Sequence, residues 1–420
     1  MSIPDFERKL DHYADLIVKV GLNLQPGQRL MISNPSTRGV LLHTAPLVRK
    51  VAASAYRAGA RLVDVMWGDE ALMKIRLENA AKDSLAEYPT WQIKGMEDYF
   101  QQGDAFLSIR SNNPDLLSGL DAELVGIVQK AHLENMAPYS EAISRNAVNW
   151  CVVTASGPDW ATRVFSDLSP QAAEEQLWQV IFEICRLNQP DPVSAWKEHI
   201  QNLLKRSAYL EAKQYAALHY TAPGTDLTIG LPAGHRWISA RMPAQNGINF
   251  TANLPTEEVF TMPHYAQVNG TIRASMPLSY GGALIEDFSL TFEKGRVVRF
   301  SARKGEAILK KLIETDDGSA CLGEVALVPY SSPISQSGIL FYDPLIDENA
   351  SCHLALGRAY RFTLQGGEGL SDEEFRARGG NVSLAHVDFM VGSAELDIDG
   401  IKPDGSREPV LRVGEWAFDV

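Results

Sequence analysis

The stretch Pro26-Gly-Gln-Arg-Leu-Met-Ile-Ser33 places a turn directly before a short apolar run, and it decides the fold class of the first half of the chain. Pro-Gly is a strong turn signal, and the run at 29–33 is predicted to form a short buried strand. Residues 4–24 carry an amphipathic helical pattern, and residues 39–58 form a second predicted helix that ends near Gly59. The stretch is therefore expected to be one strand between two helices.

Three further apolar runs continue this alternation, at residues 61–67, 105–110 and 150–154, with helical stretches between them. Strands and helices that alternate at this spacing favour right-handed crossovers and a parallel sheet. No GxGxxG or GxxxxGK[ST] sequence follows any of these strands. The usual phosphate-binding loops of nucleotide-binding folds are therefore missing.

The character of the sequence changes after residues 170–214, which are predicted to be helical with a break at Asn188-Gln-Pro-Asp-Pro192. Strand-like runs dominate beyond that point, and a helix is expected at 304–315. The runs lie at 215–220, 226–229, 257–261, 270–274, 283–292, 296–303 and 323–328. We therefore expect an α/β N-terminal domain with a mainly parallel sheet (1–195), followed by a mainly β (α+β) C-terminal domain (196–420) that carries the chemistry.

Composition narrows the class of protein. The chain has 420 residues, 45% of them hydrophobic and 22% charged, which is typical of a globular protein. A net charge of −13 argues against a nucleic-acid partner, because phosphate binding needs basic patches. The four cysteines show no CxxC spacing, and no apolar run is long enough for a membrane span. These features favour a cytoplasmic protein without membrane association.

Two segments in the last third gather residues that can bind metals. Asp343–Tyr360 is predicted to be a loop running into a helix, on which His353 and Tyr360, two turns apart, would share a face. His386 and Asp388 lie in a β-prone run, where alternate residues point to the same side. A single histidine is more often a hydrogen-bonded core residue. Several buried acids without a cation would leave unpaired charge, however, so the grouping favours a metal site with nitrogen and oxygen ligands.

Two other acidic positions stand in apolar strand contexts. Glu324 has apolar neighbours on both faces of its predicted strand, so it is expected to be buried and to need a partner. Glu257 and Glu258 are adjacent, so they would point to opposite faces of a strand, one toward a site and one away. A solvated edge is the alternative for this pair.

Four sequence blocks, in order, resemble the family of two-metal peptidases that includes the thermophilic aminopeptidase T and aminopeptidase S. The blocks are Asn253-Leu-Pro-Thr-Glu-Glu-Val-Phe-Thr261, Leu322-Gly-Glu-Val-Ala-Leu-Val328, Phe341-Tyr-Asp-Pro-Leu-Ile-Asp-Glu-Asn-Ala-Ser-Cys-His-Leu-Ala-Leu-Gly357 and His386-Val-Asp-Phe-Met-Val-Gly-Ser393. The resemblance implies an exopeptidase that removes N-terminal residues from peptides by a two-metal-activated water. It also implies a homodimer, and a C-terminal domain that holds two divalent ions.

The resemblance also implies a set of ligands. Its motifs fall on Glu324, His353, Tyr360, His386 and Asp388, and the remaining carboxylate falls in the Thr-Glu-Glu block. The spacing expected for the family favours Glu258 over Glu257. All of these donors are nitrogen or oxygen, so the set suits zinc, cobalt, manganese or magnesium, and the sequence does not choose among them.

Glu348 is the leading candidate for a general base, because it stands five residues before His353 at the start of the same predicted helix. It could instead be a ligand, or a first-turn acid that offsets the helix dipole. Asp347 and Asn349 are predicted to be capping residues. Tyr360 could ligate through its phenolate or donate a hydrogen bond to a developing oxyanion.

Two other functions compete with the aminopeptidase. One is a metal-dependent amidohydrolase that acts on small non-peptide amides, which would not require a free amine in its substrate. The other is a non-catalytic binding or scaffold protein that keeps the fold, whose sequence signature would be the loss of ligands. No ligand position in the matching motifs is lost.

Overall fold

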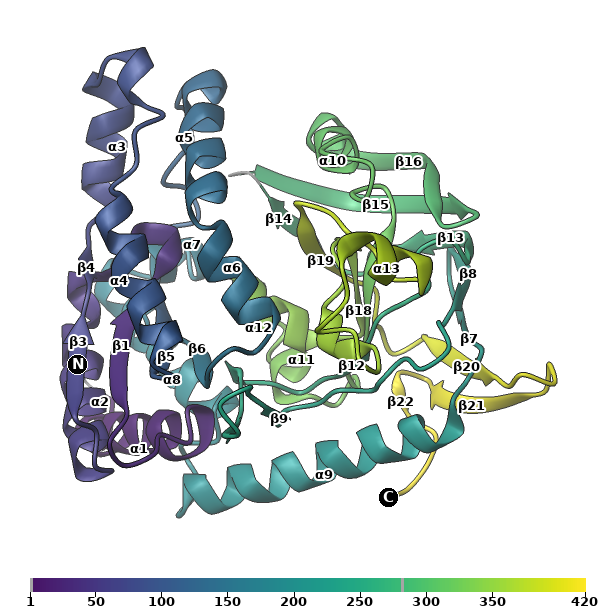
Figure 1. The fold of residues 1–420 in the computed structure, drawn as a ribbon, viewed down its shortest axis with the longest axis horizontal. Coiled ribbons are helices and arrows are strands. Elements are labelled where there is room, and N and C mark those ends of the chain that lie inside the picture. The colour runs from purple at the N-terminus through teal and green to yellow at the C-terminus, as the bar shows by residue number, and fades with distance from the viewer. Residues whose placement is uncertain (1–2, 281–282) are drawn as a thin grey trace. The chain divides into compact units, whose positions relative to one another are not determined.

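The computed structural model describes residues 3–280 and 283–420, which divide into two compact units (Figure 1). The first comprises Met1–Glu198 together with Arg241–Pro255, and the second comprises His199–Ala240 together with Thr256–Val420. The first unit thus includes a segment that follows part of the second in the sequence.

The main sheet of the first unit is parallel, with the strand order β11-β6-β5-β1-β3. The parallel sheet predicted from the alternation of strands and helices is confirmed. Its strands are β1 (Arg29–Ser33), β3 (Leu62–Val65), β5 (Ala105–Arg110), β6 (Trp150–Thr154) and β11 (Asn253–Leu254). Short pairs also form between β2 (Val40–Leu41) and β4 (Trp67–Gly68), and between β9 (Met242–Pro243) and β10 (Asn249–Phe250).

Helices pack on both faces of this sheet. On one face, Met31 and Phe106 form an apolar cluster with residues of α4. On the other face, a Cβ placed on Gly21 would lie 2.7 Å from the Cys151 sulfur, so only glycine allows this close contact. The helices of this unit are α1 (Phe6–Leu16), which continues as a π-helical turn (Ile17–Gly21), α2 (Ala45–Arg57), α3 (Glu70–Asn79), α4 (Thr90–Gln101), α5 (Ala122–Asn135), α6 (Ala137–Ser144), α7 (Pro158–Val164) and α8 (Pro170–Ile184). Helix α9 (Pro192–Lys213) begins in this unit, and its residues from His199 onward belong to the second.

The second unit contains two antiparallel sheets. The larger has nine strands in the order β14-β15-β13-β8-β7-β20-β21-β22, with β16 on β15. These strands are β7 (Ala217–Ala222), β8 (Thr225–Gly230), β13 (Val268–Arg273), β14 (Leu278–Tyr280), β15 (Ala283–Glu293), β16 (Arg296–Lys304), β20 (Asp397–Ile401), β21 (Arg407–Arg412) and β22 (Glu415–Trp416). Helices α10 (Glu306–Ile313), α11 (Pro333–Ser337) and α13 (Asp372–Ala377) also belong to this unit.

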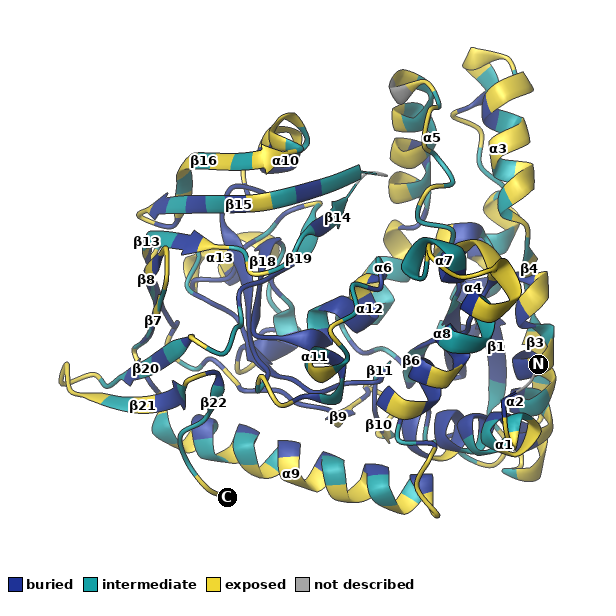
Figure 2. Ribbon diagram, turned by 180° about the vertical axis from the view of Figure 1, so that it is seen from behind, coloured by how far each residue is buried: buried dark blue, intermediate teal, exposed yellow. Residues whose placement is uncertain are grey.

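The smaller sheet has the order β12-β17-β18-β19. Its strands are β12 (Val259–Thr261), β17 (Leu322–Leu327), β18 (His353–Gly357) and β19 (His386–Met390). Every residue of β17 and β18 is buried, as the dark blue strands of Figure 2 show for β18. The prediction that Glu324 lies in a buried strand is therefore confirmed.

The prediction of a helix carrying both His353 and Tyr360 is wrong. A short helix α12 (Pro344–Asp347) and a 3₁₀ turn (Glu348–Ala350) end before His353, which begins strand β18. Because β18 lies between two other strands and is buried on both faces, its apolar run lacks the alternation that marks a half-buried strand.

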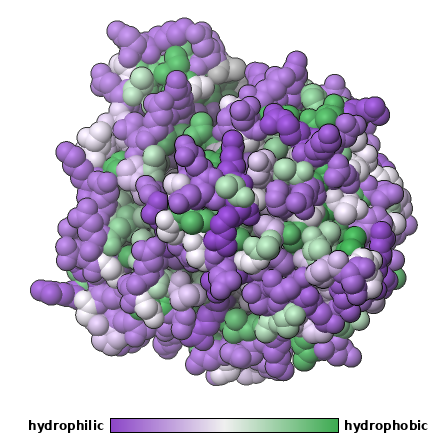
Figure 3. Space-filling view, turned by 45° about the vertical axis from the view of Figure 1, so that its right-hand side comes forward, coloured by the Kyte–Doolittle hydropathy of each residue, from purple (hydrophilic) through white to green (hydrophobic). Residues whose placement is uncertain are grey.

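Hydrophilic residues predominate on the face shown in Figure 3, and hydrophobic residues are scattered over it in small groups. Across the two described ranges, no helix is both long and apolar enough to cross a bilayer.

Candidate metal centre

The register of the small sheet places four of the predicted ligands on one face. Residues directly opposite each other in an antiparallel pair point to the same side. Glu324 of β17 stands opposite Ala355 of β18, which in turn stands opposite Asp388 of β19. His386 is two residues from Asp388, and His353 is two residues from Ala355, so both share that face.

Small residues separate these side chains. Ala326 stands opposite His353, Ala355 opposite Asp388, and Gly357 opposite His386. Larger side chains at these positions would fill the space between the polar groups. The polar cluster therefore lies on a face of the sheet where the residues between its side chains are small and apolar.

His353 lies near two of the predicted carboxylate ligands. Its Nε2 atom lies 3.1 Å from Oε2 of Glu258 and 3.5 Å from Oε1 of Glu324. Its Nδ1 atom lies 3.1 Å from the carbonyl oxygen of Ser351. Because a carbonyl can only accept, Nδ1 carries the hydrogen and Nε2 is presented to the carboxylates.

His386 is held in the same way and lies near Glu324 and Asp388. Its Nδ1 atom donates to the carbonyl oxygen of Arg358 at 2.6 Å. Its Nε2 atom lies 3.7 Å from Oε2 of Glu324 and 3.6 Å from Oδ1 of Asp388. Carbonyls that fix the ring orientation are typical of histidines that bind metals.

Glu324 belongs to both groups, one oxygen facing each histidine. Glu258, Glu324 and His353 offer ligand atoms within 4.8 Å of one another, and so do Glu324, His386 and Asp388. One carboxylate thus contributes an oxygen to each of the two groups.

Burial makes this cluster electrostatically unusual. Burial raises the pKa of Glu324 to about 7, with a further contribution from Asp388 and an opposing hydrogen bond from His353. Burial and the carboxylates of Asp388 and Glu258 raise the pKa of Glu348 well above its usual range. Burial favours a lower pKa for His353, but hydrogen bonds to Glu258 and Glu324 outweigh it and raise the pKa well above normal. Packing several acids together in this way is typical of functional sites.

The donor atoms fit divalent cations. Oδ1 of Asp388 is buried and makes no hydrogen bond to the described residues, since its 3.6 Å separation from His386 is too long for one. Four carboxylates, Glu258, Glu324, Glu348 and Asp388, face two imidazoles. A cation would compensate both the buried negative charge and the unbonded oxygen.

The other predicted residues lie around this cluster. The ring centroid of Tyr360 is 4.8 Å from that of His386, and burial, followed by Glu324 and Asp388, raises the pKa of Tyr360 well above its usual range. Glu348 lies in the 3₁₀ turn beside the cluster, so it is near Asp388 without sharing a helix with His353. The two adjacent glutamates reach different partners: Glu258 faces His353, whereas Glu257 lies 3.5 Å from Nε2 of His199.

Two residues predicted to cap a helix have other contacts. Asp347 accepts hydrogen bonds from the backbone amides of Phe341 and Asp343. The side-chain oxygen of Asn349 accepts from the amide of Glu257 at 2.8 Å, and its nitrogen donates to the Leu345 carbonyl at 3.0 Å. Asn349 thus ties the segment before β12 to the turn that carries Glu348. Sequence reasoning missed this contact because it joins residues 92 positions apart.

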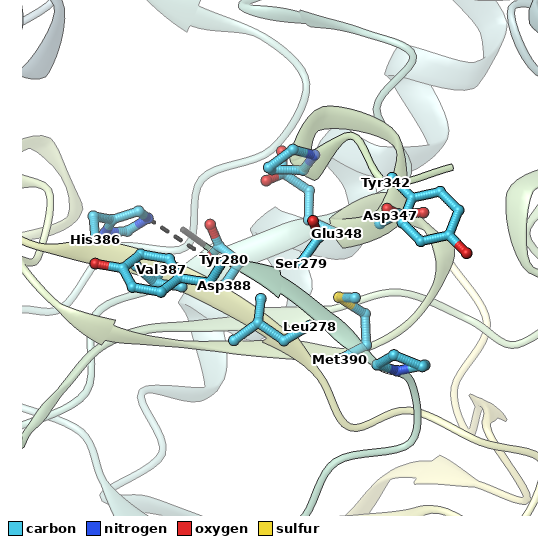
Figure 4. A pocket seen from close by; sticks show the side chains of 12 residues that line it. Leu278, Ser279, Tyr280, Tyr342, Asp347, Glu348, His386, Val387, Asp388 and Met390 are labelled. Atoms are coloured by element: carbon cyan, nitrogen blue, oxygen red, sulfur yellow. Dashed lines mark ion pairs between the residues drawn. The ribbon is translucent and has the colours of Figure 1, made fainter. Parts of the chain in front are cut away.

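A cavity of about 200 Å³ lies beside the cluster and is lined in part by His386, Asp388 and Glu348 (Figure 4). Its other walls come from the β14 segment, the turn before α12 and the end of β19. They are formed by Pro277, Leu278, Ser279, Tyr280, Tyr342, Pro344, Asp347, Val387 and Met390. The polar cluster is therefore accessible from a space that also has apolar walls.

Known proteins resemble this chain over almost its whole length. Residues 6–416 match the sequence model of thermophilic metalloproteases (M29). Aminopeptidase 2 of Geobacillus stearothermophilus is 48% identical over 415 residues, which are 99% of this chain and 99% of that protein. AmpS of Bacillus subtilis is 49% identical over 413 residues, 98% of this chain and 99% of that protein. The solved structure of wild-type AmpT from Thermus thermophilus superposes with a TM-score of 0.91 at 43% identity, covering 98% of this chain and 100% of that one.

Proposed function

The chain belongs to the family of thermophilic metalloproteases (M29), and from this membership we propose that the cluster on β17, β18 and β19 is its catalytic centre. The protein is a metal-dependent aminopeptidase, a hydrolase that acts on peptides. The observation that carries the assignment of the centre is the placement of Glu324 between two histidines, with one carboxylate oxygen toward each.

Two divalent ions would be held by the two ligand groups. Glu258, His353 and one oxygen of Glu324 would hold the first, and Asp388, His386 and the other oxygen of Glu324 would hold the second. Bound divalent ions acidify water and polarise carbonyl groups, which are the two requirements of amide hydrolysis. Zinc, cobalt, manganese and magnesium all accept this set of nitrogen and oxygen donors.

Glu348 and Tyr360 supply the chain's own contribution to the reaction. The carboxylate of Glu348 lines the cavity and would take the proton of the attacking water, then return it to the leaving amine. The ring of Tyr360 packs beside that of His386, and its hydroxyl would donate a hydrogen bond to the oxygen that becomes negative as the carbonyl is attacked.

Removal of a single N-terminal residue requires that the free amine be recognised. An α-ammonium group is favoured beside the carboxylates of Glu348 and Asp388, which line the cavity, whereas an acetylated amine has no charge to place there. We therefore expect cleavage to require an unblocked N-terminus.

The experiment compares unblocked and N-acetylated aminoacyl p-nitroanilides before and after chelation, with each of the four metals added back. Chelator should abolish hydrolysis, at least one metal should restore it, and acetylated substrates should be inert. Full activity in chelator, or equal cleavage of blocked and free substrates, would contradict the proposed centre.

The oligomeric state is proposed from the resemblance to aminopeptidases T and S. We propose a homodimer, because an exopeptidase benefits from an enclosed centre that excludes folded chains. Sedimentation at micromolar concentration tests this, and a fully active monomer would contradict it. The four cysteines are buried free thiols, which is compatible with the cytoplasmic location that we propose.

A further inference from the structure

We propose that the 200 Å³ cavity beside the cluster binds the side chain of the substrate's N-terminal residue, and that Leu278 and Met390 make it select an uncharged apolar side chain. This inference rests on the proposed aminopeptidase function and adds its substrate class. The known reaction requires only that some N-terminal residue be accepted, so the preference has to come from the walls of this space.

Strand β19 connects the cluster to the apolar wall. His386, Asp388 and Met390 alternate along it, so all three side chains point to the same face. Met390 stands directly opposite His353, as Asp388 stands opposite Ala355. The methionine therefore lies one strand repeat, about 7 Å, beyond the last carboxylate on the face where the reaction would take place.

Strand β14 supplies the second apolar wall. The amide of Ser275 donates to the Met390 carbonyl at 2.9 Å, which fixes the segment leading into β14 against the end of β19. Leu278 then lines the same cavity as Met390. In Figure 4 both side chains lie below Asp388, whereas Glu348 lies above it. A bound residue would thus have carboxylates near its amine and apolar groups near its side chain.

The lining residues disfavour acidic side chains, because they offer no basic partner. Asp347, Glu348 and Asp388 line the cavity, and none of its described lining residues is lysine or arginine. A glutamate or aspartate side chain that reached the apolar wall would lose its hydration against Leu278 and Met390 and would find no lysine or arginine to pair with there.

A basic side chain is disfavoured for a different reason. Two of the acids that line the cavity are already engaged: Asp347 accepts two backbone amides, at 2.8 and 3.1 Å, and Asp388 belongs to a proposed group of metal ligands. Leu278 and Met390 are 6% and 3% exposed and offer no strong acceptor, so an ammonium or guanidinium group would lose its hydration there without compensation.

The size of the cavity limits what it can hold. About 200 Å³ is below the range of roughly 300–1,000 Å³ that is typical of sites for drug-sized ligands. The space therefore suits one side chain. A flexible methionine in its wall can adapt to leucine, methionine or phenylalanine side chains.

The test measures kcat/KM of the metal-loaded enzyme on X-Ala dipeptides in which X is Leu, Met, Phe, Ala, Lys or Glu. Leu, Met and Phe should exceed Ala by at least about tenfold, since each methylene in an apolar pocket is worth about 10- to 200-fold. Glu should be the poorest substrate and Lys should stay below Leu. Equal rates for Leu and Ala, or a preference for Lys or Glu, would overturn the proposal.

Variants then assign the preference to the two residues. Met390→Ala and Leu278→Ala should each lower the Leu-to-Ala ratio of kcat/KM by about tenfold while metal content stays at the wild-type level. Leu309→Ala is the matched control, because Leu309 is fully buried on α10 of the same unit and is absent from the cavity walls. It should lower stability and leave the ratio unchanged.

The outcomes separate this proposal from the function on which it rests. Absence of metal-dependent cleavage of every unblocked substrate would overturn the aminopeptidase centre itself. Normal metal-dependent cleavage with a Leu-to-Ala ratio that neither cavity variant alters would overturn only the assignment of the cavity. If one variant fails to fold, the other variant and the wild-type panel still decide.

Discussion

Glu324 is the residue on which the two halves of the proposed centre depend. Its oxygens lie 3.5 Å from His353 and 3.7 Å from His386, and no other residue belongs to both ligand groups in the described chain. Loss of this carboxylate should therefore affect both ions, whereas loss of a terminal ligand should affect one of them most.

Metal counting checks this expectation. Glu324→Ala should lower the metal content by up to two ions per chain, and His353→Ala or Asp388→Ala by about one. Glu258→Gln should also lose metal, whereas Glu257→Gln should retain it, because Glu257 faces His199. Elemental analysis after gel filtration gives the stoichiometry. Reversal of the two glutamine results would assign the ligand to Glu257.

Glu348→Gln separates a base from a ligand and from a structural acid. Glutamine keeps the shape but cannot take a proton, so kcat should fall by about 10²- to 10⁴-fold while metal content and melting temperature stay nearly constant. Steady-state kinetics, elemental analysis and a melting curve measure the three quantities. A normal kcat with full metal would remove Glu348 from the mechanism, and lost metal would make it a ligand.

At the level of elements, the sequence predicted the strands well where flanking turns bounded them. The expected strand at 105–110 is β5 within the same limits, and the one at 296–303 is β16 to within one residue. The sequence predicts a helix at 353–360, where the structure has strand β18, because the seven-residue spacing of His353 and Tyr360 also fits two helical turns. Periodicity cannot separate a fully buried strand from a helix.

The same limit applies to the candidate site. The motifs pointed to the acids and histidines one by one, but the contacts of Asn349 and the cavity wall at Leu278 come from pairings across the chain. Local pattern carries no information about such pairings, because the partners are brought together only by the sheets.

The turn at Glu348–Ala350 should be weakened by Asn349→Ala. The amide of Glu257 would lose its acceptor, at a cost of about 1–3 kcal/mol, and the neighbouring Glu258 would be held less firmly. Denaturant unfolding and metal titration should show lower stability and weaker metal binding. Asn79→Ala is the matched control, since Asn79 also donates to a carbonyl four residues back but is exposed. Similar effects of both variants would refute the role of the Glu257 contact.

The start of α3 gives a pH prediction remote from the metal centre. Burial, with Asp159 and Asp69 nearby, raises the pKa of Glu70 to about 7, although the amide of Asn113 donates to it. The unfolded value is about 4.3, so the folded state binds this proton more tightly. The stability that protonated Glu70 contributes is therefore fully present below about pH 4 and is lost as the pH rises through 7.

Glu70→Gln removes this titration and keeps an oxygen for Asn113. The melting temperature of the variant, relative to wild type, should therefore rise between pH 5 and pH 8. Both proteins are compared in chelator, so that loss of metal at low pH does not contribute. A difference that stays constant or falls would contradict the raised pKa.

On the scale of the whole molecule, the predicted domain boundary between residues 195 and 196 stays a prediction. A division of the chain at a single point would also leave out a later segment that belongs to the first unit. Arg241–Pro255 returns to the first unit, where β11 pairs with β6. Leu254 is fully buried there, and a Cβ on Gly21 would lie 3.0 Å from it. The segment completes the edge of the parallel sheet.

Leu254→Ala should destabilise the first unit by about 2–5 kcal/mol, because a buried leucine leaves a cavity when it is truncated. Hydrogen exchange should show faster opening of β5 and β6, with β7 and β8 of the second unit as the internal reference. Unchanged protection of β6 would mean that the sheet does not depend on this segment.

The late position of β11 also has a consequence for biosynthesis. About 100 residues separate the end of β6 from β11, which at 5–20 residues per second corresponds to about 5–20 s of translation. During that time the nascent chain has β6 as an unpaired strand edge, the kind of surface that recruits other chains. The yield of this protein should therefore depend on a ribosome-associated chaperone or on a pause in translation after residue 255. A protein whose first domain contains every strand of its sheet should depend less on either.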